Sequence, residues 1–270
     1  MVIRPLDVDR LRREFREAEP YPHIKIDGFL DEDFVHEVAG AYPTFGEASK
    51  LGLEFEAVNE VGKIQITEAE KFPDPVARLN DALASEEFRA QLAEISGIGE
   101  LTADAALAGG GMHMTKARGR LDVHVDFNFN DRLQLHRRLN LLVYLNPTWE
   151  PTWGGGVEIW DTEVEKRYAV FTPKLNRAVL FETSDHSFHG VEEVRCPPEL
   201  TRNSFAVYYY SPEPPPGYAG HDHSTIFKAR PDETLKKHVL MPAERAKRAL
   251  AEGGRKVRRA GEKLGLLDRE

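Results

Sequence analysis

The amino-acid sequence predicts a mainly β fold with flanking helices, an α+β protein whose strands form an antiparallel sandwich or barrel. Eight short apolar segments follow one another between residues 109 and 212, with turn residues and no helical pattern between them. The first hundred residues, by contrast, mostly show helical periodicity. With 270 residues, 41% of them apolar and 30% charged, the chain can bury a sizeable core.

The N-terminal elements are expected to be helices and one strand. Residues 8–18 are charged with a sparse apolar stripe, which favours a helix. HIKIDGFL (23–30) alternates as a strand does. Three acidic residues at 31–33 mark the start of a helix over FVHEVAGAY. Residues 74–98 hold two more helical segments, and Ser85 is the expected N-cap of the second.

The strands of the core are expected to be short and separated by turns. Glycines 154–156 and residues 173–176 are expected to form two of these turns. The predicted strands are GMHMTKA, LDVHVDFN, LNLLVYLN, VEIWD, RYAVF, RAVLF, HGVEEV and RNSFAVYYYS.

Three segments are therefore expected along the chain. Residues 1–108 pack on the core, residues 109–212 form it, and residues 213–270 provide a proline-rich linker, a loop and a basic helical tail. Residues 236–263 of that tail contain ten basic and three acidic residues, a net charge of +7. The formal charge of the whole chain is −9, which disfavours binding to nucleic acid.

Composition also indicates where the protein works. No run of eighteen apolar residues is present, so no membrane span is expected, and the N-terminus lacks the apolar core of a signal peptide. Cys196 is the single cysteine, which rules out an internal disulfide framework. These features favour a reducing cytoplasm.

One strand carries two ionisable side chains on one face. In LDVHVDFNFN (121–130), His124 and Asp126 are two residues apart, and side chains at i and i+2 of a strand project to the same side. The valines and the phenylalanine around them take the opposite, apolar face. A histidine and an aspartate on a strand face are often merely solvated or paired, so the pair alone leaves both interpretations open.

A third group could join this pair. His189 opens a predicted strand in TSDHSFHGVEEV, and two histidines with one carboxylate form the facial triad of non-haem Fe(II) oxygenases. Further on, strand alternation places Arg202, Ser204, Ala206 and Tyr208 on one face. A guanidinium that faces a cavity suits a carboxylate, and beside a facial triad we expect the distal carboxylate of 2-oxoglutarate.

Together these motifs resemble the prolyl-hydroxylase-like Fe(II)/2-oxoglutarate-dependent dioxygenases. The resemblance covers residues 109–212, nearly two-fifths of the chain, and is carried by HVDF (124–127), YLN followed by W, GGG and VEIWD (144–161), HGVEEV and RNSFAVYYY. The opening PYPHIKIDGFLDEDF is also similar to the segment before the core in bacterial members. The resemblance implies a double-stranded β-helix core (jelly-roll, cupin-like), two antiparallel sheets with iron at their open end.

The resemblance also implies catalytic roles. His124, Asp126 and His189 would ligate Fe(II), and Arg202 would anchor 2-oxoglutarate, the co-substrate. Ascorbate is a further reductant that such an enzyme could use. Related halogenases replace the carboxylate ligand with a small residue, so Asp126 speaks against halogenation.

Two more residues are expected to bind 2-oxoglutarate. Tyr144, in YLN, matches a tyrosine that often adds its hydroxyl to the same carboxylate, and its alternation with Asn140 and Leu142 is compatible with an inward position. Ser204 lies one inward step after Arg202 and could form a hydrogen bond there.

Other histidines compete for a place in the site. His186 lies in the turn TSDH, whereas His189 begins a strand and is followed by Gly-Val as in the family, so His189 is favoured. His113 could face the cavity, although packing in the core or on the surface is the commoner role. His221 and His223 lie beyond the core in a loop, where solvent exposure or a lid is expected.

The implied reaction is hydroxylation of an unactivated C–H bond with O₂, with release of succinate and CO₂. No peptide-binding repeat is visible, so the sequence favours a small-molecule substrate such as an amino acid, a sugar or a natural-product intermediate. The alternative is a prolyl residue of a protein or peptide. A core that has lost catalysis and only binds a metal is a third interpretation, and a homo-oligomer is left open.

Overall fold

The computed structural model describes residues 2–242, and the chain divides into two compact units, residues 1–228 and 229–270. All described strands lie in the first unit. Its α-helices are α1 (Val8–Glu17), α2 (Glu32–Gly40), α3 (Phe45–Leu51), α4 (Asp74–Ala84) and α5 (Glu86–Ser96). Its strands are β1 (His23–Asp27), β2 (Leu53–Ala57), β3 (Glu60–Ile66), β4 (Thr102–Ala103), β5 (Gly111–Val125), β6 (Phe129–Asn130), β7 (Leu135–Tyr144), β8 (Val157–Trp160), β9 (Arg167–Phe171), β10 (Arg177–Glu182), β11 (His189–Val191), β12 (Thr201–Ser211) and β13 (Ile226–Phe227).

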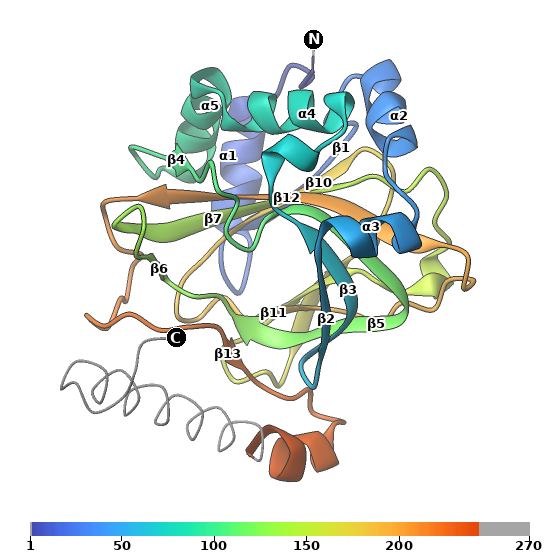
Figure 1. The fold of residues 1–270 in the computed structure, drawn as a ribbon. Coiled ribbons are helices and arrows are strands. Elements are labelled where there is room, and N and C mark those ends of the chain that lie inside the picture. Colours follow the sequence, from blue (N-terminus) through green and yellow to red (C-terminus); the bar gives the residue numbers. More distant parts are fainter. Residues whose placement is uncertain (1, 243–270) are drawn as a thin grey trace, which may run out of the picture. The chain divides into compact units, whose positions relative to one another are not determined.

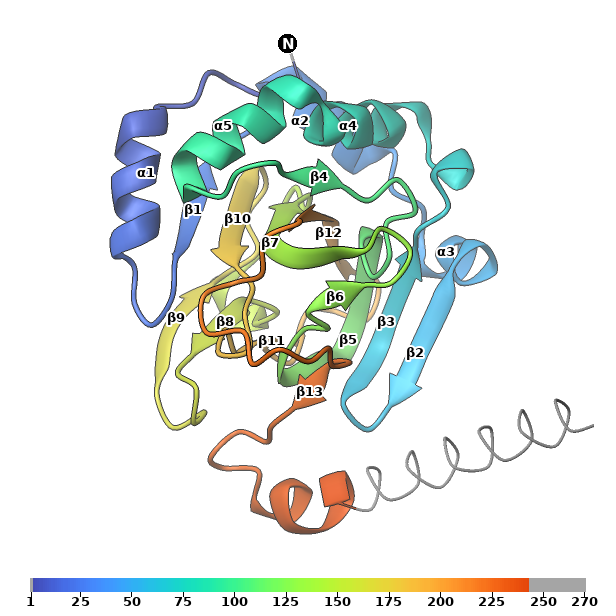
Figure 2. The ribbon, with the colours of Figure 1, turned by 90° about the vertical axis from the view of Figure 1, so that its left-hand side faces the viewer.

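The strands of this unit are arranged antiparallel in the order β1-β10-β7-β12-β5-β11-β8-β9. The hairpin β2/β3 also pairs with β5. The sheet curls into two facing layers, with β7 and β12 above and β11 below in Figure 1, and β8 beside β11 in Figure 2. This is the jelly-roll arrangement of a double-stranded β-helix, and the predicted fold class is confirmed.

Strand β5 connects the two layers. Its first half pairs with β12, whereas His124 and Leu121 in its second half pair with β11. The strand bends at Arg118, where φ is +67°, and Gly119, where an added Cβ would lie 2.9 Å from the carbonyl oxygen of Val61. The sequence predicted two strands here, and the structure replaces them with one bent strand.

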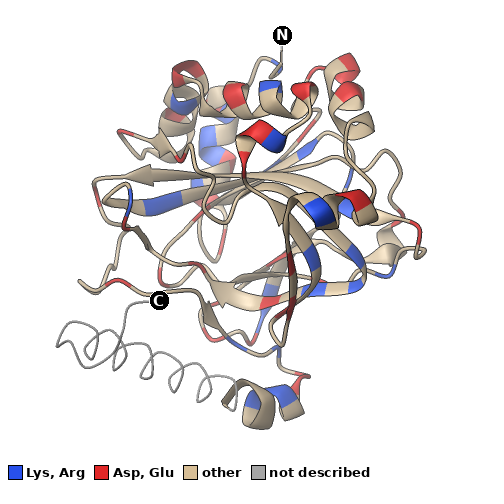
Figure 3. Ribbon diagram, in the orientation of Figure 1, with Lys and Arg blue, Asp and Glu red and all other residues tan. Residues whose placement is uncertain are grey.

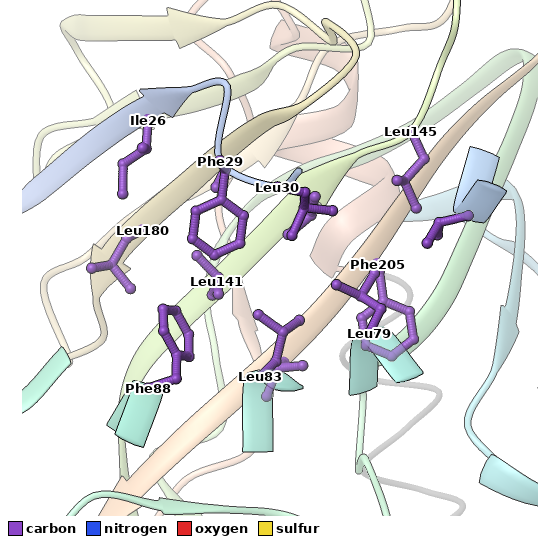
Figure 4. Packing of buried hydrophobic residues seen from close by; sticks show 14 of the residues in the cluster. Ile26, Phe29, Leu30, Leu79, Leu83, Phe88, Leu141, Leu145, Leu180 and Phe205 are labelled. Atoms are coloured by element: carbon purple, nitrogen blue, oxygen red, sulfur yellow. The ribbon is translucent and has the colours of Figure 1, made fainter. Parts of the chain in front are cut away.

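Helices α1, α2, α4 and α5 cover the outer face of the upper layer (Figure 1). In Figure 4, Leu83 and Phe88 of the helices lie against Leu141, Leu180 and Phe205 of the strands. Each fully buried leucine or phenylalanine contributes about 1.5–3 kcal/mol to the free energy of unfolding. In Figure 3, acidic and basic residues are interspersed along these helices.

The alternation of β7 separates two cores. Leu139, Leu141 and Val143 pack under the helices, whereas Leu142 and Tyr144 belong to a second apolar cluster between the two layers. The inner face of β7 therefore borders the interior of the jelly roll, as the sequence pattern predicted.

Helix starts follow the predicted caps. The carboxylate of Asp31 accepts a hydrogen bond from the backbone N–H of Phe34 at 3.3 Å, and the hydroxyl of Ser85 accepts one from Phe88 at 3.3 Å. The acidic start at residues 31–33 and the Ser85 cap are confirmed.

The expectation of a single strand in the first hundred residues is wrong. Helix α3 and the hairpin β2/β3 lie between residues 45 and 66. In β2 every side chain is exposed or half-buried, so LEFEA carries no apolar face that periodicity could detect. The hairpin forms because β3 pairs with β5, a contact distant in the sequence.

In the second unit, the described residues include a short π-helical turn, Lys236–Leu240. Most of the predicted basic tail, residues 236–263, lies outside the described residues. Among the residues that the structure describes, no helix is both long enough and apolar enough to cross a membrane.

Candidate metal and co-substrate site

A cavity of about 60 Å³ opens inside the jelly roll, and its wall includes all four residues to which the sequence assigned catalysis. The wall is formed by β3, β5, β7, β8, β10, β11 and β12. Apolar residues such as Leu142, Val157 and Phe181 alternate on it with histidines and charged groups. A mostly apolar cavity with a few converging polar groups is the usual form of a small-molecule site.

A His–Asp–His cluster forms where β5 runs beside β11. His189 is directly opposite His124 in the strand pairing, and their ring centroids are 4.3 Å apart. Oδ1 of Asp126 lies 3.5 Å from Nε2 of His124, and Oδ2 lies 3.4 Å from Nε2 of His189. One potential ligand atom from each residue lies within 4.8 Å of the other two. One ion could therefore contact all three residues.

Backbone carbonyls set the tautomer of both rings. Nδ1 of His124 lies 2.9 Å from the carbonyl oxygen of Asp122, and Nδ1 of His189 lies 2.9 Å from that of Ser187. Because a carbonyl oxygen only accepts, each Nδ1 carries a hydrogen, which leaves Nε2 of each ring as the atom that faces the cluster and could bind a metal. Burial and the nearby His124 lower the pKa of His189, which favours its neutral ring. Two imidazoles and a carboxylate fit non-haem Fe(II).

Asp126 is held as an anion by two polar partners. Nη2 of Arg137 lies 3.0 Å from Oδ2, and Nδ2 of Asn140 donates to the same oxygen at 2.8 Å. Burial by itself would raise the pKa of this carboxyl. The Arg137 guanidinium and the two histidine rings nevertheless hold the pKa of Asp126 well below its usual range. The carboxylate therefore stays charged as the pH falls.

Sequence reasoning missed Arg137 because of a β-bulge. Strict alternation would place it on the helix-covered face of β7 with Leu139. In the structure, Tyr209 pairs with Leu139 but Tyr210 pairs with Arg137, so Arg138 is an extra residue in β7. The bulge returns Arg137 to the inner face. The only signal in the sequence is a pair of arginines before an apolar strand.

Arg202 is 3% exposed and has its donors fixed by the protein. Its Nε donates to the carbonyl oxygen of Gly155 at 2.6 Å, Nη1 to the hydroxyl of Ser204 at 3.1 Å, and Nη2 to the hydroxyl of Tyr144 at 3.4 Å. Gly155 has a φ of +72°, and an added Cβ would lie 3.2 Å from Cδ of Arg202. The second glycine of GGG thus allows the backbone to approach the arginine.

Tyr144 and Ser204 contact Arg202 but are absent from the cavity wall. The hydroxyl of Tyr144 donates to the carbonyl oxygen of Phe171 at 3.0 Å and accepts from the N–H of Val157 at 3.2 Å. Both hydroxyls therefore support the guanidinium in this structure, and their contact with a co-substrate stays a prediction.

The other histidines are distributed differently. His186 is exposed in the turn between β10 and β11 and lies outside the cluster. His113 is buried and lines the cavity, with Nε2 3.1 Å from the carbonyl oxygen of Gly109. Burial, followed by the charges of Lys63 and Arg202, holds the pKa of His113 well below its ordinary value. It is therefore a neutral group of the cavity wall.

His221 and His223 lie on a segment, residues 221–228, that we term the strap. Nε2 of His223 lies 2.9 Å from a carboxylate oxygen of Asp185, and its backbone N–H donates to the side chain of Asn128 at 2.9 Å. The strap ends in β13, which pairs with the metal-cluster half of β5. It therefore ties the chain just after Asp126 to the turn just before His189.

Two cations that sequence reasoning did not consider border the cavity. Lys63 comes from β3 and Arg120 from β5. Nζ of Lys63 lies 2.9 Å from a carboxylate oxygen of Glu60, and Nε of Arg120 lies 3.8 Å from one of Asp122. Lys63 could not be found because its hairpin was not predicted.

Comparison with known proteins agrees with this site. The 2OG-Fe(II) oxygenase superfamily matches residues 110–210, which include the cluster and Arg202. A mouse protein, prolyl 3-hydroxylase OGFOD1, is 29% identical over 218 residues. That match covers 75% of this chain, and the chain spans 35% of the length of the mouse protein, about a third.

Solved structures show the same fold. A prolyl-4-hydroxylase from Pseudomonas putida matches with a TM-score of 0.53 and 15% identity, over 74% of this chain and 98% of that chain. A Trichoplax adhaerens prolyl hydroxylase, in complex with a peptide fragment of the oxygen degradation domain of hypoxia inducible factor, gives a TM-score of 0.51 and 18% identity, over 75% of this chain and 90% of that chain.

The fold, the cluster and the matched family define an oxidoreductase of the Fe(II)- and 2-oxoglutarate-dependent dioxygenase class. Within that class, the match over residues 110–210 and the similarity to the mouse protein support a resemblance to the prolyl-hydroxylase-like 2OG-Fe(II) oxygenases. The resemblance to this family, the oxidoreductase class, and Fe(II) and 2-oxoglutarate as cofactors, all predicted from the sequence, are confirmed. Ascorbate and a homo-oligomer stay predictions.

Proposed function

We propose that this protein hydroxylates a prolyl residue of a protein or peptide. In this proposal His124, Asp126 and His189 ligate Fe(II), and Arg202 binds the distal carboxylate of 2-oxoglutarate with the support of Tyr144 and Ser204. The buried His–Asp–His cluster, which shares its cavity with a buried arginine, is the observation that carries the chemistry.

The chain's own residues prepare the cavity for this reaction. The backbone carbonyls behind both histidines keep their Nε2 atoms available to a metal. The carbonyl of Gly155 and two hydroxyls fix the plane of Arg202, so its fork is oriented before a carboxylate arrives. When bound, Fe(II) supplies the O₂ chemistry that couples decarboxylation of 2-oxoglutarate to hydroxylation of the substrate.

The mouse relative supports the choice of substrate. Its name describes it as a prolyl 3-hydroxylase, and its match to this chain includes more than the core motifs. This supports the prolyl alternative over the small-molecule substrate that the sequence alone favoured. Since the chain spans about a third of that relative, the substrate is a proposal for this chain.

The metal ligands can be tested without a substrate. Anaerobic protein with Fe(II) and 2-oxoglutarate should show a weak visible metal-to-ligand charge-transfer band. His189→Ala should abolish this band, and the matched variant His186→Ala, three residues away and exposed, should keep it. Loss of the band in His186→Ala but not in His189→Ala would show that His186, and not His189, is the ligand.

The substrate class can be tested by comparing peptides with small molecules as substrates. We expect purified enzyme with Fe(II), 2-oxoglutarate and O₂ to add one oxygen atom to proline in a proline-containing peptide library, as read by mass spectrometry. Succinate release should rise with the same peptides. If succinate release rises with free amino acids or sugars while the peptides stay unmodified, the prolyl proposal is overturned in favour of a small-molecule substrate.

A further inference from the structure

Arg137 is a charged side chain buried behind the catalytic cavity. It is 2% exposed and does not line the cavity, so no molecule in the cavity as it stands would contact it directly. Its Nη2 lies 3.0 Å from Oδ2 of Asp126, an ion pair without the geometry of a hydrogen bond. Charge this deeply buried is costly unless it is paired, so its position requires an explanation.

A closed triangle joins Arg137, Asn140 and Asp126. Nε of Arg137 donates to Oδ1 of Asn140 at 2.9 Å, and Nδ2 of Asn140 donates to Oδ2 of Asp126 at 2.8 Å. The Arg137 contact orients the amide of Asn140 with its nitrogen toward the carboxylate. Both partners therefore hold the same carboxylate oxygen, while Oδ1 points toward His124 at 3.5 Å.

Aromatic rings fix the guanidinium in this position. Its central carbon lies 3.5 Å from the ring centroid of Tyr208 and 4.7 Å from that of Phe127. Rings on the guanidinium attract its charge and restrict its rotation. The triangle is therefore a rigid unit built from the bulge in β7, the strand β12 and the residue after Asp126.

We propose that Arg137 and Asn140 are positioning residues that make Asp126 a one-oxygen metal ligand. A carboxylate can bind a metal through one or both oxygens. Oδ2 is held by the hydrogen bond from Asn140 and by the ion pair with Arg137, so we expect Oδ1 to be the oxygen that binds the ion. If both oxygens bound, they would occupy a position that the facial triad must leave open for 2-oxoglutarate and O₂. This inference rests on the proposed role of Asp126 as a ligand.

The test compares two neighbouring arginines. Arg137→Met removes the charge and keeps the length of the side chain. Arg138→Met is the matched control, because Arg138 is 5% exposed on the same strand but lies 3.7 Å from Glu182 and donates to the carbonyl oxygen of Glu213. Metal binding is read from the visible absorption of Co(II), whose bands report coordination number. Affinity for 2-oxoglutarate is read by titrating the anaerobic Fe(II) charge-transfer band.

We expect Arg137→Met to change the Co(II) spectrum and to weaken 2-oxoglutarate binding about tenfold or more, because loss of a group that orients a metal ligand typically costs about 10–100-fold in metal affinity or activity. Arg138→Met should match the wild type in both measurements. A wild-type Co(II) spectrum and 2-oxoglutarate affinity in folded Arg137→Met would overturn the proposal. If Arg137→Met does not fold, Asn140→Leu should give the same two changes, and a wild-type result in Asn140→Leu would equally overturn it.

Failure of the proposed function gives a different result. If Asp126 is not a ligand, Asp126→Ala will bind Co(II) with the wild-type spectrum. If Asp126→Ala alters Co(II) binding while Arg137→Met does not, Asp126 is a ligand and the positioning role alone is refuted.

Discussion

Arg202 has three of its nitrogen atoms engaged by protein acceptors, and this pre-orientation has a measurable consequence. We expect Arg202→Ala to weaken 2-oxoglutarate binding, because loss of one partner of a buried, hydrogen-bonded charge pair costs about 2–5 kcal/mol. Each 1.4 kcal/mol corresponds to about a tenfold change in the dissociation constant. Co(II) binding without 2-oxoglutarate should stay at the wild-type level. Unchanged affinity for 2-oxoglutarate would move the anchor to another cation, with Lys63 the first candidate on the cavity wall.

A glycine beside this arginine allows a finer test. Gly155→Ala places a methyl group 3.2 Å from Cδ of Arg202 at a φ of +72°, a conformation that costs a non-glycine residue about 1–2 kcal/mol. We expect a lower midpoint of urea unfolding and weaker 2-oxoglutarate binding. Gly46→Ala, in α3, meets nothing within 4 Å and should leave the site unchanged while adding about 0.5–1 kcal/mol of stability. Equal effects of both substitutions would contradict a specific role for Gly155.

The direction of single side chains was predictable where a strand alternates regularly. His124, Asp126 and Arg202 could be placed on inward faces because alternation fixes the direction of each side chain. Arg137 could not, because an extra residue in β7 reverses the alternation at that point. Such a bulge depends on the partner strand, so a single sequence carries almost no trace of it.

At the scale of elements, the strap is the segment most directly coupled to the cluster. Phe227 pairs with His124 across β13 and β5, and their rings are 5.4 Å apart. The backbone N–H of Lys228 donates to the carbonyl oxygen of Val123 at 2.8 Å. The strap thus pairs with the end of the strand that carries His124 and leads directly into Asp126.

A pair of shortened chains tests this coupling. A chain that ends at Gly220 loses β13 and the His223–Asp185 contact, so we expect weaker Co(II) binding and a lower unfolding midpoint. A chain that ends at Lys228 keeps the whole first unit and should bind Co(II) as the full-length protein does. If both chains bind Co(II) equally well, the strap has no influence on the cluster.

The sequence predicted the buried strands of the jelly roll better than the short or exposed strands that pair with them. Strands with a buried face, such as β7 and β12, show an apolar pattern that identifies them. Strand β2 has no buried face, and β13 is two residues long, so neither gives a periodic signal. Their pairing with distant strands, rather than their own composition, makes them strands.

For the whole molecule, buried histidines predict how stability depends on pH. Burial lowers the pKa of His23 and His113 in the folded protein, and for His113 the charges of Lys63 and Arg202 lower it further. Below about pH 6.5, the ordinary pKa of histidine, the unfolded chain therefore binds more protons than the folded one. Stability should then fall with falling pH, by at most about 1.4 kcal/mol per pH unit for each such histidine.

Urea unfolding of metal-free protein between about pH 7 and pH 5 would measure this slope. His113→Asn should reduce it by up to about 1.4 kcal/mol per pH unit relative to the wild type. Comparison of the variant with the wild type cancels the contributions of other groups to this slope. One such group is Glu182, whose pKa is raised by burial. An identical slope in the variant would mean that His113 is protonated in the folded protein.

The pairing of His189 with His124 limits how relatives of this chain can vary in length. Between Asp126 and His189 the chain crosses several surface loops, and an insertion in any of them would leave both strands in register. A single residue inserted between Leu121 and His124, or between His189 and Val191, would turn one imidazole to the opposite face of the sheet. The separation of the two histidines along the chain can therefore drift widely among homologues, while the few residues beside each histidine cannot change in number.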